Sequence, residues 1–206
     1  MRYLLFSIFI WGSCVSDYKT LKRIAIDKDC LHSIKPEPLL TSWYDASVEV
    51  VGKHISGLLL IKNMPDSSTR VVFTNEAGIK FLDFGFAADH SFKVHYLMKQ
   101  LDRKPVIQTL REDFELILQK PFQPPPTEAY QNEKGQTLFA YPQKNETAYF
   151  ITDKDCASLQ SFEVGSGRKR KSSVIFYGKD IQAPDSINLK HHTFNMNITL
   201  RKLVRE

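Results

Sequence analysis

From Trp43 onward, the sequence is a succession of short β-type runs separated by a few turn residues. The expected strands lie at 46–52, 55–62, 69–75, 78–86, 91–97, 137–142, 146–152, 157–164, 171–178, 185–190 and 193–204. Connections this short join antiparallel neighbours, because a parallel pair needs a long crossover. A sheet of about eleven strands usually curls or closes. We therefore expect a mainly β chain built on one curled antiparallel sheet.

One helix interrupts this pattern, over residues 105–118. Pro105 suits the first turn, where a missing N–H costs nothing. Apolar side chains then recur at helical spacing, at Ile107, Leu110, Phe114, Ile117 and Leu118. An amphipathic helix of this kind is suited to covering an apolar sheet surface.

The alternation of side chains within the strands indicates an apolar interior. In the last strand, the even positions from Phe194 to Leu200 are apolar and the odd positions are polar, which predicts one dry face. The runs 58–61, 71–73 and 79–86 are apolar on both faces, so each needs two covers, which a core or a hydrophobic cavity can supply. For any single residue, the alternative is that it packs in an ordinary hydrophobic core and lines no cavity. The candidate cavity-lining residues are Leu58, Leu60, Val71, Phe73, Leu82, Phe84, Phe194, Met196 and Ile198.

The N-terminus has the pattern of an export signal. Arg2 precedes an apolar run of nine residues, Tyr3 to Trp11. Spanning a bilayer takes about twenty such residues, whereas a signal-peptide core takes fewer. The small residues Gly12 and Ser13 follow, and Cys14 comes directly after them.

The stretch Trp11-Gly12-Ser13-Cys14 resembles the lipobox of bacterial lipoproteins, although Trp11 stands where Leu, Val or Ile is usual. The resemblance implies a lipoprotein signal peptide at 1–13 and acylation of Cys14, for example with palmitate. The alternative is an ordinary secretory signal cleaved nearby, in which Cys14 is incidental.

The three cysteines are an odd number for an exported chain. With lipid on Cys14, Cys30 and Cys156 remain as a possible disulfide pair in an oxidising compartment. Two free buried thiols are the alternative. The polar stretch 14–42, interrupted by Pro36 and Pro38, reads as an N-terminal tether, and residues 43–206 as the β domain.

The sequence contains no catalytic constellation, no metal-ligand spacing and no cofactor motif. His191 and His192 are adjacent on a strand, so they point to opposite faces and make a poor metal site. Asp83 is a candidate buried carboxylate with a raised pKa, or a hydrogen-bonded structural residue. We therefore expect no enzymatic activity, no metal and no cofactor.

The net charge of +5 does not indicate nucleic-acid binding, because the basic residues are scattered and no binding module is present. One dense cluster, from Arg168 to Lys171, lies in a turn between two expected strands. It is either a solvated hairpin tip or a contact with anionic lipid headgroups.

Three stretches resemble the LolA/LolB family. They are an early strand at 54–62, a hairpin at 70–86, and a closing pair made of 184–189 and 194–200. The resemblance implies an unclosed β-barrel with an α-helical lid. Because of Cys14, it favours the membrane-anchored, LolB-like branch of the family. That branch implies a monomeric outer-membrane lipoprotein that faces the periplasm. It would receive acylated lipoproteins from a soluble LolA-like carrier and help to insert them into the outer membrane, as a chaperone does.

One position departs from the family pattern. The resemblance implies a protruding leucine at a hairpin tip that contacts the membrane, and the matching residue here is Ala77. Met64 in the preceding turn is a candidate substitute. Two other functions stay open: a structural or interaction lipoprotein with a filled core, and an enzyme on a β scaffold.

Overall fold

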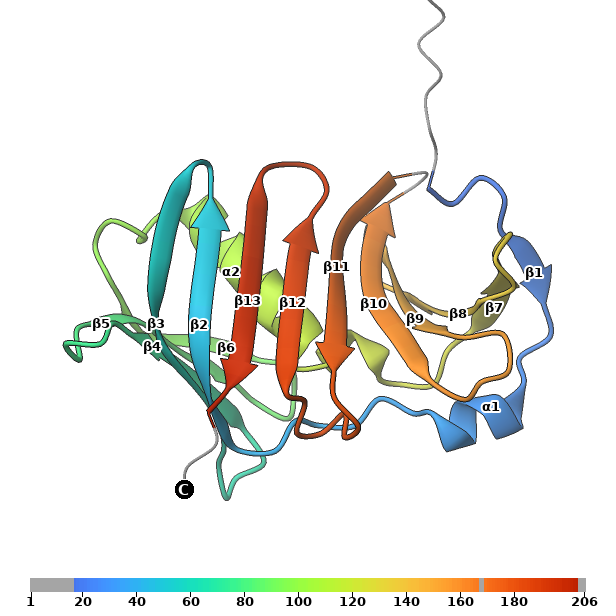
Figure 1. The fold of residues 1–206 in the computed structure, drawn as a ribbon, viewed down its shortest axis with the longest axis horizontal. Helices are drawn as coiled ribbons and strands as arrows, with labels where there is room; N and C mark the ends of the chain where they lie inside the picture. The colour runs from blue at the N-terminus through green and yellow to red at the C-terminus, as the bar shows by residue number, and fades with distance from the viewer. Residues whose placement is uncertain (1–16, 167–168, 204–206) are drawn as a thin grey trace, which may run out of the picture.

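The computed structural model describes residues 17–166 and 169–203. Its strands form one thirteen-stranded antiparallel sheet, in the order β1-β7-β8-β9-β10-β11-β12-β13-β2-β3-β4-β5-β6. The sheet curls around a helix, and its edge strands β1 and β6 are not paired with each other (Figure 1). The predicted fold class, a curled and unclosed antiparallel sheet with few helices, is confirmed.

The sheet can be divided into two halves by its strand order. One half contains β2 Ser42–Val50, β3 Lys53–Asn63, β4 Thr69–Thr74, β5 Lys80–Phe86 and β6 Phe92–Leu97, together with β12 Ser186–His191 and β13 Met196–Lys202 from the middle of the sheet. The other half is β1 Lys22–Ile24, β7 Glu128–Gln131, β8 Thr137–Pro142, β9 Thr147–Thr152, β10 Leu159–Ser166 and β11 Lys169–Tyr177.

All eleven expected strands are present, and two short ones were not anticipated. β1 and β7 have three and four residues, too few to show alternation, and they pair with each other. The stretch expected as a tether thus contributes an edge strand. It also contributes α1 Lys28–Ser33, whose N-cap Asp27 accepts hydrogen bonds from two backbone N–H groups.

Helix α2, Lys104–Ile117, crosses the concave face of the sheet (Figure 1). It begins and ends within one residue of the predicted bounds, with proline in its first turn. Its C-terminal half is buried, with Phe114 against Phe84 of β5. The 3-10 helix η1, Lys120–Phe122, then places Phe122 among the rings of Phe150 and Phe162. This second aromatic cluster fills the β8–β10 half of the sheet.

Cys30 and Cys156 form a disulfide that joins α1 to the turn between β9 and β10. The bridge closes a loop with a sequence separation of 126 residues. It fixes the N-terminal segment to the half of the sheet that this segment borders.

Candidate functional site

An apolar pocket lies between the N-terminal half of α2 and the concave face of the sheet. Its volume is about 290 Å³. Its walls come from the strands β2, β3, β4, β5 and β13, from the turn before β13, and from α2 with the turn before it. The lining residues are Val48, Val50, Ile55, Leu59, Phe73, Leu82, Leu101, Pro105, Val106, Thr109, Leu110, Phe114, Phe194, Met196 and Ile198.

The β2–β3 hairpin decides which side chains of β3 reach this pocket. Val51 and Gly52 both have positive φ, which makes a two-residue turn and pairs Val50 with Lys53. Counting outward from that pair places Ile55 and Leu59 on the concave side. The turn residues therefore set the register that the apolar run 58–61 leaves ambiguous.

The pocket wall is almost entirely hydrocarbon. Thr109 is the one lining residue with a polar side chain, and no lining residue is ionisable. A charged headgroup would find no counter-ion here and would lose its hydration, which is costly. The pocket therefore suits an alkyl chain or another apolar group whose polar end stays outside.

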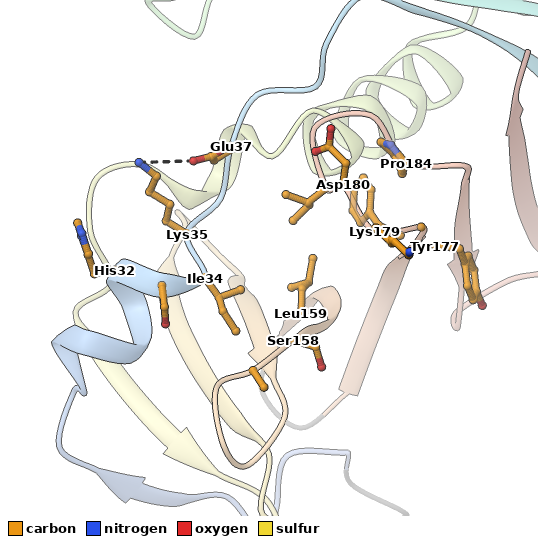
Figure 2. A pocket seen from close by; sticks show the side chains of 15 residues that line it. His32, Ile34, Lys35, Glu37, Ser158, Leu159, Tyr177, Lys179, Asp180 and Pro184 are labelled. Carbon is orange, nitrogen blue, oxygen red and sulfur yellow. Dashed lines mark ion pairs between the residues drawn. The ribbon is translucent and has the colours of Figure 1, made fainter. Parts of the chain in front are cut away.

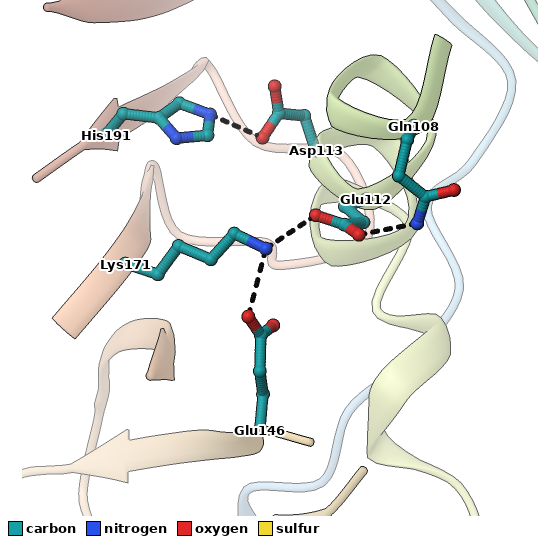
Figure 3. Close-up of polar contacts among 6 residues, drawn as sticks. All are labelled: Gln108, Glu112, Asp113, Glu146, Lys171 and His191. Carbon is teal, nitrogen blue, oxygen red and sulfur yellow. Dashed lines mark hydrogen bonds and ion pairs between the residues drawn. The ribbon is translucent and has the colours of Figure 1, made fainter. Parts of the chain in front are cut away.

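A buried hydrogen-bonded pair fastens α2 to the sheet beyond the pocket. The Nε2 of His191, on β12, and Oδ1 of Asp113, on α2, are hydrogen-bonded at 2.7 Å (Figure 3). Both side chains are almost fully buried. Burial raises the pKa of the Asp113 carboxyl, an effect that its bond to His191 only partly opposes. His192 points the other way and contacts Ser173, as the strand periodicity predicts.

A second polar contact lies beside the first. Lys171 Nζ of β11 lies 2.7 Å from Glu112 Oε2 of α2 and 3.0 Å from Glu146 Oε1, just before β9 (Figure 3). Burial disfavours each charge, but the ion pair outweighs it, so the pKa of Glu112 is lowered and that of Lys171 is raised. The C-terminal half of α2 is thus held by both apolar and polar contacts.

The N-terminal half of α2 is less buried. Lys104, Pro105 and Gln108 are exposed, and Val106 and Leu110 are only half-buried over the pocket. The two halves of the helix therefore differ in how firmly the sheet holds them.

The structure brings together five of the nine residues predicted to line a cavity: Phe73, Leu82, Phe194, Met196 and Ile198. Val71 and Phe84 are fully buried on the same face but lie in the core and do not line the pocket. The prediction for Leu58 and Leu60 was wrong, because both alternate with the pocket residue Leu59 and so project from the opposite face of β3.

The other predicted positions are scattered. Met64 precedes β4 and Ala77 follows it, so the two lie at opposite ends of that strand and cannot share one membrane contact. Ala77 is exposed and Met64 is half-buried. Cys14 lies outside the described residues.

Asp83 is a structural residue on the face opposite the pocket. Its carboxylate accepts two hydrogen bonds from Arg70, at 2.6 and 3.0 Å, and one from Lys80 at 2.7 Å. Burial disfavours the carboxylate, but the two cations outweigh it and lower the pKa of Asp83. The pKa shift is opposite in direction to the one expected for a general acid.

A second cavity, of about 390 Å³, lies beside α1 and the turns at 157–159 and 178–184 (Figure 2). Its labelled side chains point in different directions, and Lys35 and Glu37 pair with each other at 3.5 Å. Nothing in it converges on one point, so it offers no specific chemistry.

Within residues 17–166 and 169–203, no group of His, Cys, Asp and Glu side chains is arranged to hold a metal ion. None of the helices in that part of the chain has the length and apolar character needed to cross a membrane.

Comparison with known proteins gives fold neighbours of low similarity. The sequence matches no protein-family model and no curated protein. A LolA superfamily protein from Nitrosomonas europaea has a TM-score of 0.49 and 6% identity, over 89% of this chain and 95% of its own. A Vibrio parahaemolyticus domain assigned to outer membrane lipoprotein sorting has a TM-score of 0.42 and 8% identity, over 80% and 83%. A DUF1329 family protein from Desulfovibrio piger has a TM-score of 0.37 and 8% identity, over 80% and 84%. Similarities this low do not assign a family or a function.

Proposed function

We propose that this protein binds an acyl chain in the pocket under α2, and that it carries acylated lipoproteins or other lipids to the outer membrane. The observation that supports it is the hydrocarbon wall of a preformed pocket: fifteen lining residues include none that can ionise. A site with this composition binds the alkyl part of a ligand and makes no specific contact with its headgroup. It is therefore suited to cargoes that share only their acyl chains.

Burial of the acyl chain supplies the free energy for binding. Each methylene removed from water stabilises the complex by about 0.8 kcal/mol, so six contribute about 5 kcal/mol. A volume of about 290 Å³ is at the low end of ligand pockets, which span roughly 300–1,000 Å³. The closed pocket thus accommodates one alkyl segment, and a longer ligand requires the N-terminal half of α2 to move outward.

The N-terminus supports a place for this activity. A lipid on Cys14 would hold the domain at the outer membrane, on the periplasmic side, where a LolA-like carrier could deliver cargo. Transfer then needs no nucleotide, provided that the pocket holds the chain more tightly than the carrier and less tightly than the bilayer.

The test is to fill the pocket. Ile55→Phe adds volume to the pocket wall and should weaken binding of a fluorescent acyl probe by at least about tenfold, which corresponds to 1.4 kcal/mol. Leu58→Phe is the matched control, because it lies on the same strand and faces away. Binding of the probe should be unchanged in that control. In parallel, solvent extraction and mass spectrometry of the purified protein should recover a lipid.

Equal probe binding by the parent and Ile55→Phe would contradict acyl binding in this pocket. Absence of any extractable lipid, together with no uptake from a loaded carrier, would favour the alternative of a structural lipoprotein.

A further inference from the structure

Three pairs of strand ends lie in a row on one side of the sheet, drawn uppermost in Figure 1. Edge here means this row of strand ends, not an edge strand. They are the turn between β2 and β3, the turn between β12 and β13, and the adjoining ends of β10 and β11. The first two turns are joined, because the Val51 N–H donates a hydrogen bond to the carbonyl of Asn195. The pocket extends to this edge, since Val50 and Phe194 lie there and line it.

Val51 stands out in the first of these turns. Its φ is +47°, in the left-handed region that a β-branched residue seldom adopts. Its side chain is also 73% exposed. Asparagine is preferred at such a position in a two-residue hairpin turn. Phe194, in the neighbouring turn, is 41% exposed. Two large apolar side chains therefore project from turns that would ordinarily be polar.

Cations lie around these apolar side chains. Lys53, Lys169 and Lys190 are exposed and sit at or next to the three pairs of strand ends. None of the three forms an ion pair with a described residue, whereas the nearby Glu49 is paired with His54. Of the dense basic cluster, Arg170 is paired with Glu163, and Lys171 is held in the polar contact with α2.

The N-terminal segment reaches the domain at the same edge. The Asp17 carboxylate accepts a hydrogen bond from the Arg170 backbone N–H, and Tyr18 packs on Tyr149 and donates a hydrogen bond to Glu163. Asp17 and Tyr18, which precede β1, therefore lie at this edge of the domain.

We infer that this edge is a docking surface for an anionic bilayer, with Val51 and Phe194 as its apolar contacts and Lys53, Lys169 and Lys190 as its cations. The occupant follows from the chemistry: unpaired lysines around exposed apolar tips match anionic headgroups over hydrocarbon. Docking here would bring this end of the pocket to the membrane. Phe194 belongs to both this surface and the pocket wall, whereas Val51, Lys53, Lys169 and Lys190 do not line the pocket. The docking surface therefore does not depend on whether the pocket carries an acyl chain.

The experiment uses the full chain with Cys14→Ala, so that no acyl anchor contributes. Its binding to vesicles of phosphatidylcholine mixed with phosphatidylglycerol is measured by flotation. Val51→Asn suits the left-handed turn, so the variant should fold while losing the apolar contact. We expect it to weaken vesicle binding several-fold. The double variant K53E/K169E should weaken it by roughly tenfold or more, and only on the anionic vesicles.

The control makes one apolar and one lysine substitution at the opposite edge, where Leu40 and Lys62 are also exposed. Leu40→Asn and Lys62→Glu should leave vesicle binding unchanged. Equal losses at both edges, or no loss in the docking-edge variants, would overturn the inference. A parent chain that dimerises through Val51, as measured by analytical ultracentrifugation, would do the same, because the surface would then join two copies. Val51→Asn should retain binding of a soluble acyl probe, which separates this result from failure of the pocket.

Discussion

At the residue scale, the structure contains two buried carboxylates whose pKa values move in opposite directions. Asp113 is almost fully buried and has one hydrogen bond, to His191, and burial raises its pKa. Asp83 is held by Arg70 and Lys80, and its pKa is lowered. Neither faces the pocket, so both act on stability.

Asp113→Asn should leave the free energy of unfolding within about 1 kcal/mol of the parent, because the amide oxygen can still accept from His191. Asp113→Ala should cost about 1–3 kcal/mol by leaving the buried imidazole unpaired. A raised folded-state pKa stabilises the parent below the unfolded-state value, about 3.9, and this contribution is lost as the pH rises. Denaturant unfolding across pH 3–7 should therefore show the parent's advantage over Asp113→Asn shrinking with rising pH. An advantage that grows with pH would contradict this description of the pair.

Asp83→Asn should show the reverse dependence. A lowered folded-state pKa contributes stability above the unfolded-state value and loses it as the pH falls through the folded-state one. At neutral pH the substitution should cost about 1–2 kcal/mol, a modest value because Arg70 and Lys80 are each more than one-third exposed. The difference from the parent should shrink as the pH falls below about 4 in the same unfolding measurement. A cost that does not change with pH would point to packing instead.

At the element scale, α2 is held unevenly along its length. Its C-terminal half carries Phe114, Ile117 and the contacts to Lys171 and His191, whereas its N-terminal half covers the pocket with half-buried side chains. Local opening is easiest where buried apolar contacts are fewest. The half over the pocket is therefore the part expected to move when a chain enters.

Hydrogen exchange tests this difference. Backbone amides of 107–110 should exchange faster than those of 111–117 in the empty protein. A bound acyl ligand should slow exchange in 107–110 and leave the C-terminal half nearly unchanged. Uniform protection along the helix, or no response to ligand, would show that α2 does not open at the pocket.

The elements also differ in how well the sequence predicts them. Long alternating strands and the amphipathic helix were predictable, because burial of one face imposes a period that can be counted. The strands β1 and β7 are too short to carry a period. The inward face of β3 was misassigned because 58–61 is apolar throughout. The positive-φ turn at Val51-Gly52, which decides the register, resembled no preferred turn sequence. The pair of Asp113 and His191, 78 residues apart, gave no local signal.

At the scale of the whole molecule, the N-terminal segment is part of the domain. β1 covers the edge of β7, and the disulfide joins α1 to the β9–β10 turn. Tyr18 lies so close to Gly165 that a Cβ on that glycine would clash with its ring. These contacts fix the point from which the chain runs toward Cys14.

Removal of the disulfide tests this integration. Cys30→Ser with Cys156→Ser should lower the free energy of unfolding by about 2–5 kcal/mol, because the unfolded chain regains the freedom of a long loop. Denaturant unfolding of the parent with and without reductant should give the same loss. No change in either experiment would mean that the segment contributes little to the stability of the domain.

The most direct test of the central claim, that an acyl chain binds under α2, is photo-crosslinking with a diazirine-bearing acyl chain followed by peptide mapping. We expect labelling of Val106 or Leu110 on α2 and of Ile55, Phe73 or Ile198 on the sheet, and loss of that labelling in Ile55→Phe. Labelling confined to the second cavity, beside α1, or to the outer face around Leu58 and Leu60, would contradict the claim.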